Sequence, residues 1–134
     1  VAAFAVAWLA ADEVQPLHEA AGYAVAALLA IRLIWGFVGS RHARFTQFVR
    51  GPAATLAYLG DMLHGRERRH LGHNPAGALV MLAMLAVVLA LGATGFLQTT
   101  DAFWGESWLQ ELHEALAATL IGAAKARLVK RALF

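Results

Sequence analysis

The chain has 134 residues, of which 60% are hydrophobic, and a mean hydropathy of +0.57. Soluble domains contain about 45–50% apolar residues even when glycine is counted, so the excess in long runs indicates a membrane protein. The absence of cysteine excludes disulfides, iron–sulfur clusters and thiolate metal ligands. The net charge of +2 is distributed between and after the apolar runs, which argues against a nucleic-acid partner.

Four apolar segments are predicted to form membrane helices, at about 1–11, 17–38, 75–97 and 107–124. The first would be only about 16 Å long at 1.5 Å per residue, whereas a hydrocarbon core is about 30 Å thick. We therefore expect this helix to be incomplete, with residues missing before Val1. In the second, Pro16 suits the first turn, and Arg32 lies near the far end, where its side chain should reach the membrane surface.

A polar stretch at 39–74 separates the second and third spans and is rich in arginine. Within it, the segment from Pro52 to His64 predicts a short amphipathic helix, with proline at its first position, Gly65 just past its end and leucines on one face. This segment is too short to span a bilayer, so we expect it to lie on the membrane surface. The arginines could bind anionic lipid head groups as well as a protein partner.

The third span is predicted to begin at Pro75, with Asn74 as its N-cap, and no charge occurs from Ala76 to Leu97. The fourth is predicted to begin near Ser107 and to stop after Ala124, where lysines and arginines follow. The fold class expected is therefore all-α, a transmembrane four-helix bundle with a truncated first helix.

Charge differences between the connections predict the orientation. The 39–74 loop and the C-terminus are basic, whereas the 12–15 turn and the 98–111 loop are acidic. The positive-inside rule places the basic side in the cytoplasm. His18, at the start of the second span, and His113, near the start of the fourth, should then lie at similar depth in the outer leaflet.

His18 and His113 are therefore the candidate metal ligands. Two neutral imidazoles that face each other across a bundle give a six-coordinate haem iron, which suits electron transfer because no position is open for oxygen. Small residues follow four positions later on the same helix faces, Gly22 and Ala117, and would let a flat porphyrin approach. The alternative is that each histidine is an ordinary polar residue at the membrane interface.

The other histidines are weaker candidates. His42, His64 and His70 lie among arginines and are expected to be solvated. His73 precedes the predicted N-cap and should only influence that helix start; contact with a cofactor or a quinone head group is the alternative.

Five motifs occur in order over most of the chain, from about residue 4 to 122. They are Leu17-His18-Glu19 with Gly22-Tyr23, Arg32 to Phe37, Ser40 to Phe45, Leu71 to Ala78, and Leu112 to Ala117. These motifs resemble bacterial cytochrome b561 proteins and the related hydrogenase-type b cytochromes. The resemblance implies an inner-membrane bundle with two b haems that relays electrons between quinone or quinol and a c-type cytochrome or dehydrogenase subunit. It also implies that His18 and His113 ligate the periplasmic haem.

A second, cytoplasmic haem is implied by the same resemblance, with one ligand early in the first helix and another further along the fourth. The first helix is short here, and the corresponding position of the fourth is Arg127. No second ligand pair is found, so we also expect residues to be missing after about Ala124.

The function predicted from the sequence is a membrane b-type cytochrome, the electron-transfer subunit of an oxidoreductase system, with haem b as cofactor and no catalytic residue. Two alternatives stay open. The chain could be a cofactor-free membrane anchor of a redox complex, or it could be a quinol-dependent oxidase.

Overall fold

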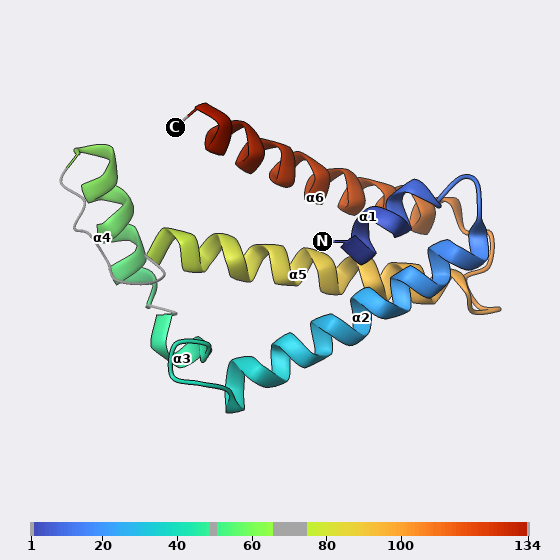
Figure 1. Cartoon of the computed structure of the whole chain (residues 1–134), viewed down its shortest axis with the longest axis horizontal. Helices are drawn as coiled ribbons and strands as arrows, with labels where there is room; N and C mark the ends of the chain where they lie inside the picture. The colour runs from blue at the N-terminus through green and yellow to red at the C-terminus, as the bar shows by residue number, and fades with distance from the viewer. Residues whose placement is uncertain (1, 49–50, 66–74, 134) are drawn as a thin grey trace. The chain divides into compact units, whose positions relative to one another are not determined.

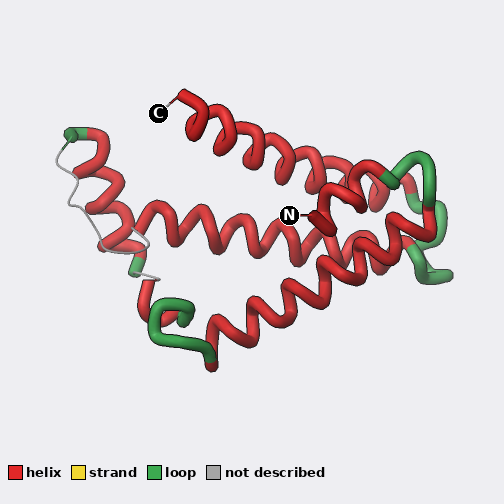
Figure 2. The backbone as a smooth tube through the Cα atoms, in the orientation of Figure 1, coloured by secondary structure: helices red, strands yellow, loops and turns green. Residues whose placement is uncertain are grey.

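The structure, a computed structural model, describes residues 2–48, 51–65 and 75–133, and within these ranges every regular element is a helix (Figure 2). Figure 1 labels them; their bounds are α1 Ala2–Leu9, α2 Gln15–Val38, α3 Phe45–Phe48, α4 Pro52–Leu63, α5 Pro75–Gln98 and α6 Ser107–Leu133. The all-α class predicted from the sequence is confirmed for the described part of the chain.

The chain divides into two compact units. Unit 1 contains residues Val1–Leu29 and Ala86–Phe134, and unit 2 contains residues Ala30–Leu85. The long helices α2 and α5 each contribute one part to each unit, whereas α1 and α6 belong to unit 1, and α3 and α4 belong to unit 2.

Among the described helices, α2 and α5 are the two that are long and apolar enough to cross a membrane. Each has 24 residues, which gives about 36 Å of helix against a hydrocarbon core of about 30 Å. Only 17% of the most apolar stretch of α2 and 6% of that of α5 is buried within the chain. A helix that is apolar on all sides must be covered by protein or by lipid, so this exposure favours a membrane environment.

The last helix, α6, differs from the sequence prediction in two respects. It continues past Ala124 to Leu133, because lysine and arginine end an apolar run but are good helix formers that also suit the negative end of the helix dipole. It is also absent from the candidate membrane spans found among the described residues, since Glu111, His113 and Glu114 reduce the apolar character of its first half. The described residues thus contain two candidate membrane spans, and the predicted transmembrane four-helix bundle is not confirmed.

The short helix predicted in the 39–74 stretch is present as α4. Gly51 precedes it, Pro52 occupies its first turn, and Gly65 beyond its end has a φ of +66°, which glycine adopts without steric cost. The four-residue α3 was not predicted from the sequence. The predicted N-cap Asn74, the predicted solvated residue His70, and His73, which was predicted to influence the helix start, lie outside the described residues.

Arg32 of unit 2 contacts other residues of this unit. The sequence had predicted that its side chain would reach the membrane surface. Its guanidinium carbon lies 5.0 Å from the centre of the Phe45 ring, and its Nη2 donates to Met81 Sδ at 3.7 Å. Its Nη1 is buried and has no acceptor among the described residues. Gly36, one turn later on α2, makes room for this arrangement, because a Cβ there would collide with the Phe45 ring.

The core of unit 1 draws on all of its helices. Leu109 in the first turn of α6 is the most deeply buried large side chain, with 1% of its surface exposed. The other buried apolar residues of this unit are Ala7, Ala10, Ala21, Leu29, Leu91, Ala117 and Leu120. All of them are alanine or leucine, and the candidate site lies in the same unit.

Candidate bis-histidine site

The structure brings together the two histidines that the sequence singled out. His18 lies in the first turn of α2, and His113 lies in the second turn of α6; both belong to unit 1 and both are half-buried. Their ring centroids are 6.1 Å apart, and the ring planes make an angle of 74°.

His18 is held by the end of α1. Its Nδ1 lies 2.8 Å from the carbonyl oxygen of Ala7. A carbonyl only accepts hydrogen bonds, so Nδ1 must carry the proton, and in the neutral ring Nε2 then has the free lone pair. The Ala7 carbonyl is one of the last of α1; the Ala11 N–H, which could have bonded to it, lies 3.3 Å from Trp8 O instead. His18 therefore satisfies a helix-end carbonyl that would otherwise lack a partner.

His113 is held by α5. Its Nδ1 lies 2.9 Å from Thr94 Oγ1. The next residue, Gly95, lets the imidazole rest on the α5 backbone, because a Cβ at Gly95 would lie 3.0 Å from His113 Cε1. Both histidines thus use Nδ1 for a hydrogen bond within the protein.

The spacing of the two ring centres, considered alone, is that of two imidazoles bound to one metal ion. Metal–imidazole bonds are about 2.0–2.1 Å long, and a ring centre lies about 1.1 Å behind the bonded nitrogen, so two imidazoles on opposite sides of one ion have centres about 6 Å apart. The observed 6.1 Å agrees with that value. Histidine ligands in metalloproteins usually donate their other ring N–H to a carbonyl or a similar acceptor, as Nδ1 of His18 does here.

The two small residues predicted to make room for a porphyrin differ in their surroundings. Gly22 is exposed, and a Cβ added there would meet nothing within 4 Å. Ala117 is 8% exposed and packs inside unit 1. Space beside the histidines is therefore open at Gly22, whereas the chain itself covers Ala117.

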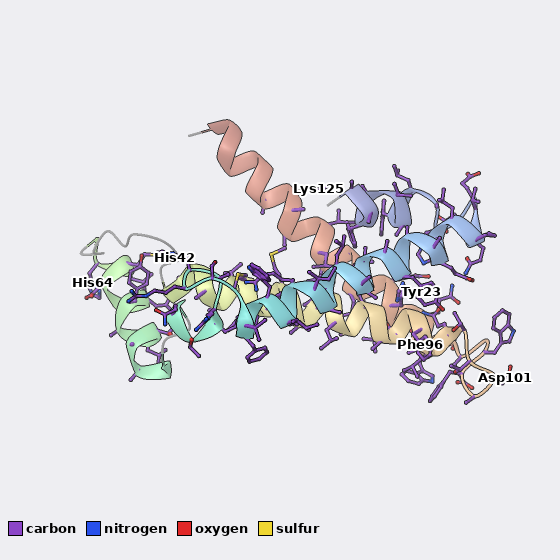
Figure 3. The ribbon with its side chains drawn as sticks, turned by 60° about the horizontal axis from the view of Figure 1, so that its bottom comes forward. Tyr23, His42, His64, Phe96, Asp101 and Lys125 are labelled. Carbon is purple, nitrogen blue, oxygen red and sulfur yellow. The ribbon has the colours of Figure 1, made fainter. Side chains whose placement is uncertain are left out.

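The remaining described histidines belong to unit 2 (Figure 3). His42 follows α2 and is exposed, and His64 caps the end of α4, where its Nδ1 donates to Gly60 O at 2.7 Å. In the described part of the chain, no group of three or more His, Asp or Glu side chains is placed to hold a metal ion. The acidic loop between α5 and α6 is marked by Asp101 in Figure 3. Backbone hydrogen bonds of successive turns stabilise this loop.

Three contributors to the site were not predicted: Thr94, Gly95 and the Ala7 carbonyl. A signal for Thr94 is present in the sequence, because it is the one polar side chain between Ala76 and Leu97. The sequence carries no signal for the Ala7 carbonyl, because every residue has a main-chain carbonyl. Only the position at which α1 ends determines which carbonyl is available.

Two exposed apolar helices and a pair of imidazoles spaced for one shared ion define a membrane protein with a candidate bis-histidine metal site. The chain belongs to the family described as prokaryotic cytochrome b561, which it matches over residues 1–125. This membership and the two apolar helices indicate an integral membrane protein.

Relatives include proteins described as "Probable Ni/Fe-hydrogenase B-type cytochrome subunit". That of Azotobacter vinelandii is 30% identical over 105 residues, which cover 71% of this chain and 43% of the relative. That of Rhizobium leguminosarum bv. viciae is 29% identical over 102 residues, which cover 69% of this chain and 42% of the relative. The chain thus spans less than half the length of these curated relatives. No solved structure matches the chain.

Proposed function

We propose that this chain is a membrane b-type cytochrome that binds one haem b through Nε2 of His18 and Nε2 of His113 and relays electrons. The 6.1 Å spacing of two rings that are each hydrogen-bonded through Nδ1 is the observation that supports this most strongly. When bound, the haem supplies a one-electron carrier whose potential depends on its axial ligands and their hydrogen bonds.

The residues of the chain hold, orient and shield that group. Ala7 O and Thr94 Oγ1 fix the two rings before the cofactor arrives, so few rotamers must be ordered on binding. Buried apolar residues of the same unit, Leu109 above all, would shield the bound group from water. If both histidines held the haem iron, they would leave no ligand position open for oxygen, which favours an electron relay over a quinol-dependent oxidase.

The wider assignment follows from family membership and charge. In this proposal the site belongs to a four-helix bundle in the bacterial inner membrane. His18 and His113 lie on the periplasmic side, because the loop rich in arginine should face the cytoplasm. Quinone or quinol is one redox partner. The other is a hydrogenase-type or dehydrogenase subunit or a c-type cytochrome, in keeping with the names of the relatives.

The test uses protein purified in detergent together with single-histidine variants. A reduced-minus-oxidised spectrum should show the α band of a b-type haem, and His18→Ala or His113→Ala should reduce the haem content to near zero. The matched controls are His42→Ala and His64→Ala, which change described histidines of unit 2 and should keep the full haem content.

Two outcomes would overturn this function. A colourless protein that still copurifies with partner subunits would make the chain a membrane anchor. An unchanged haem content in His113→Ala would refute the ligand assignment. Haem reduction on addition of quinol tests the proposed electron donor separately.

A further inference from the structure

Thr94 is the buried polar side chain of the candidate site. It lies in an otherwise apolar stretch of α5, and only 7% of its surface is exposed. A buried hydroxyl without hydrogen-bond partners would destabilise the fold. Thr94 has three polar atoms within reach: Ala90 O at 2.9 Å, Leu91 O at 3.0 Å and His113 Nδ1 at 2.9 Å.

The neighbouring carbonyls favour one direction for the hydrogen bond to His113, and the Leu91 carbonyl is itself a hydrogen-bond partner of this ring. A threonine hydroxyl has one hydrogen to donate and two lone pairs that accept. The carbonyls of Ala90 and Leu91 can only accept, so the hydroxyl hydrogen is directed to them in a three-centred bond within α5. The oxygen then accepts from His113, which requires the proton on Nδ1.

We infer that Thr94 is a positioning residue that holds His113 as the Nδ1–H tautomer and increases the electron-donor strength of its Nε2. The tautomer makes Nε2 the free nitrogen. Donation from Nδ1–H gives the ring partial anionic character, which raises ligand basicity. This inference rests on the proposed function, because the stronger Nε2 donor would stabilise ferric haem and lower the midpoint potential.

The neighbouring residue fixes the ring in the same orientation. Gly95 is next to Thr94, and a Cβ there would lie 3.0 Å from His113 Cε1 and 3.5 Å from its Nδ1. The ring therefore lies against the α5 backbone with its Nδ1 edge at the threonine. Thr94 and Gly95 together set both the position and the protonation site of the imidazole.

The two histidines differ in what can change their hydrogen bonds. His18 donates to the main-chain carbonyl of Ala7, which no side-chain substitution removes. His113 contacts the Thr94 side chain in addition to the main-chain carbonyl of Leu91, so a single substitution at Thr94 alters the contacts of this ligand and leaves those of His18 intact. The inference thus predicts that substitutions at Thr94 change the properties of His113 and leave those of His18 unchanged.

The first experiment needs no haem. Nitrogen-15 NMR of the histidine-labelled protein in detergent reports which ring nitrogen of His113 is protonated; the resonance that disappears in His113→Ala identifies it. The wild type should show the Nδ1–H tautomer. Thr94→Val, which has nearly the same shape but no hydroxyl, should show a mixture or the Nε2–H form, and Thr94→Ser should restore the wild-type signal.

The second experiment measures the haem-loaded protein. Thr94→Val should raise the midpoint potential and weaken haem retention by about 10- to 100-fold, the usual loss when a partner of a metal-bound histidine is removed. Thr94→Ser should match the wild type. The control is Thr119→Val, because Thr119 on α6 also bonds to a carbonyl of its own helix, Ala115 O at 2.8 Å, but is exposed.

The outcomes separate this inference from the proposed function. An Nε2–H tautomer in the wild type, or a tautomer and potential unchanged in Thr94→Val, would overturn the role of Thr94 even if the protein binds haem. A wild type that binds no haem but has the Nδ1–H tautomer, lost in Thr94→Val, would support the positioning role and refute the cytochrome.

Discussion

Gly22 provides a direct test of where the haem would lie. It is one turn after His18 on the same face of α2, and a Cβ there would meet nothing within 4 Å. The chain alone should therefore tolerate a larger residue, and Gly22→Leu should stabilise the helix by up to about 1 kcal/mol through helix propensity. If a porphyrin occupies that space, the new side chain overpacks the complex at a cost of about 1–3 kcal/mol. That cost corresponds to about a 5- to 150-fold loss in haem affinity.

Haem titration of the protein in detergent measures this affinity, and thermal unfolding of the haem-free protein checks the fold. The matched control is Gly122→Leu. Gly122 also has open space around it but lies on the opposite side of α6 from His113. A Gly22→Leu variant that binds haem as tightly as Gly122→Leu would refute the placement of the porphyrin beside Gly22.

Two further predictions concern stability in the haem-free protein. Leu109→Ala should lower the free energy of unfolding by about 2–5 kcal/mol, because this leucine is 1% exposed; a loss below about 1 kcal/mol in denaturant unfolding would contradict its place in the core of unit 1. Arg32→Met should change the free energy of unfolding by less than about 2 kcal/mol, because two effects of the substitution oppose each other. It removes a buried nitrogen that has no acceptor among the described residues, which is favourable, and it removes a cation–π contact with Phe45, which is unfavourable. A loss above about 3 kcal/mol, measured in the same way, would mean that Arg32 has a strong partner.

The sequence predicted the long helices well because their signal is local. The charge-free run after Pro75 and the proline in the first turn of α2 specify helices without any tertiary contact. The end of α6 was misjudged for a related reason. Hydropathy reports where an apolar stretch ends, whereas the helix continues for as long as its backbone and propensities allow.

Tertiary contacts explain what the sequence could not predict. His18 and His113 were paired from their matched positions in two spans, and the structure places their ring centres 6.1 Å apart. The partners of their Nδ1 atoms depend on how the helices pack against one another, and no periodic pattern in the sequence reports this packing. Arg32 shows the same limit: its place near a helix end predicted exposure, but stacking on Phe45 holds it inside unit 2.

The short helix α1 has a role in the site that its length does not suggest. Its last carbonyls face the turn that leads into α2, and the Ala7 carbonyl accepts from His18. Backbone hydrogen bonds from Ala10 N to Val6 O and from Val14 N to Ala10 O, both 3.0 Å, hold that turn, and His18 N bonds to Val14 O at 3.0 Å. The negative end of the α1 dipole makes its terminal carbonyls good acceptors. The turn between α1 and α2 thus fixes His18 through the main chain, whereas Thr94 fixes His113 through a side chain, so the two rings are oriented by independent parts of unit 1.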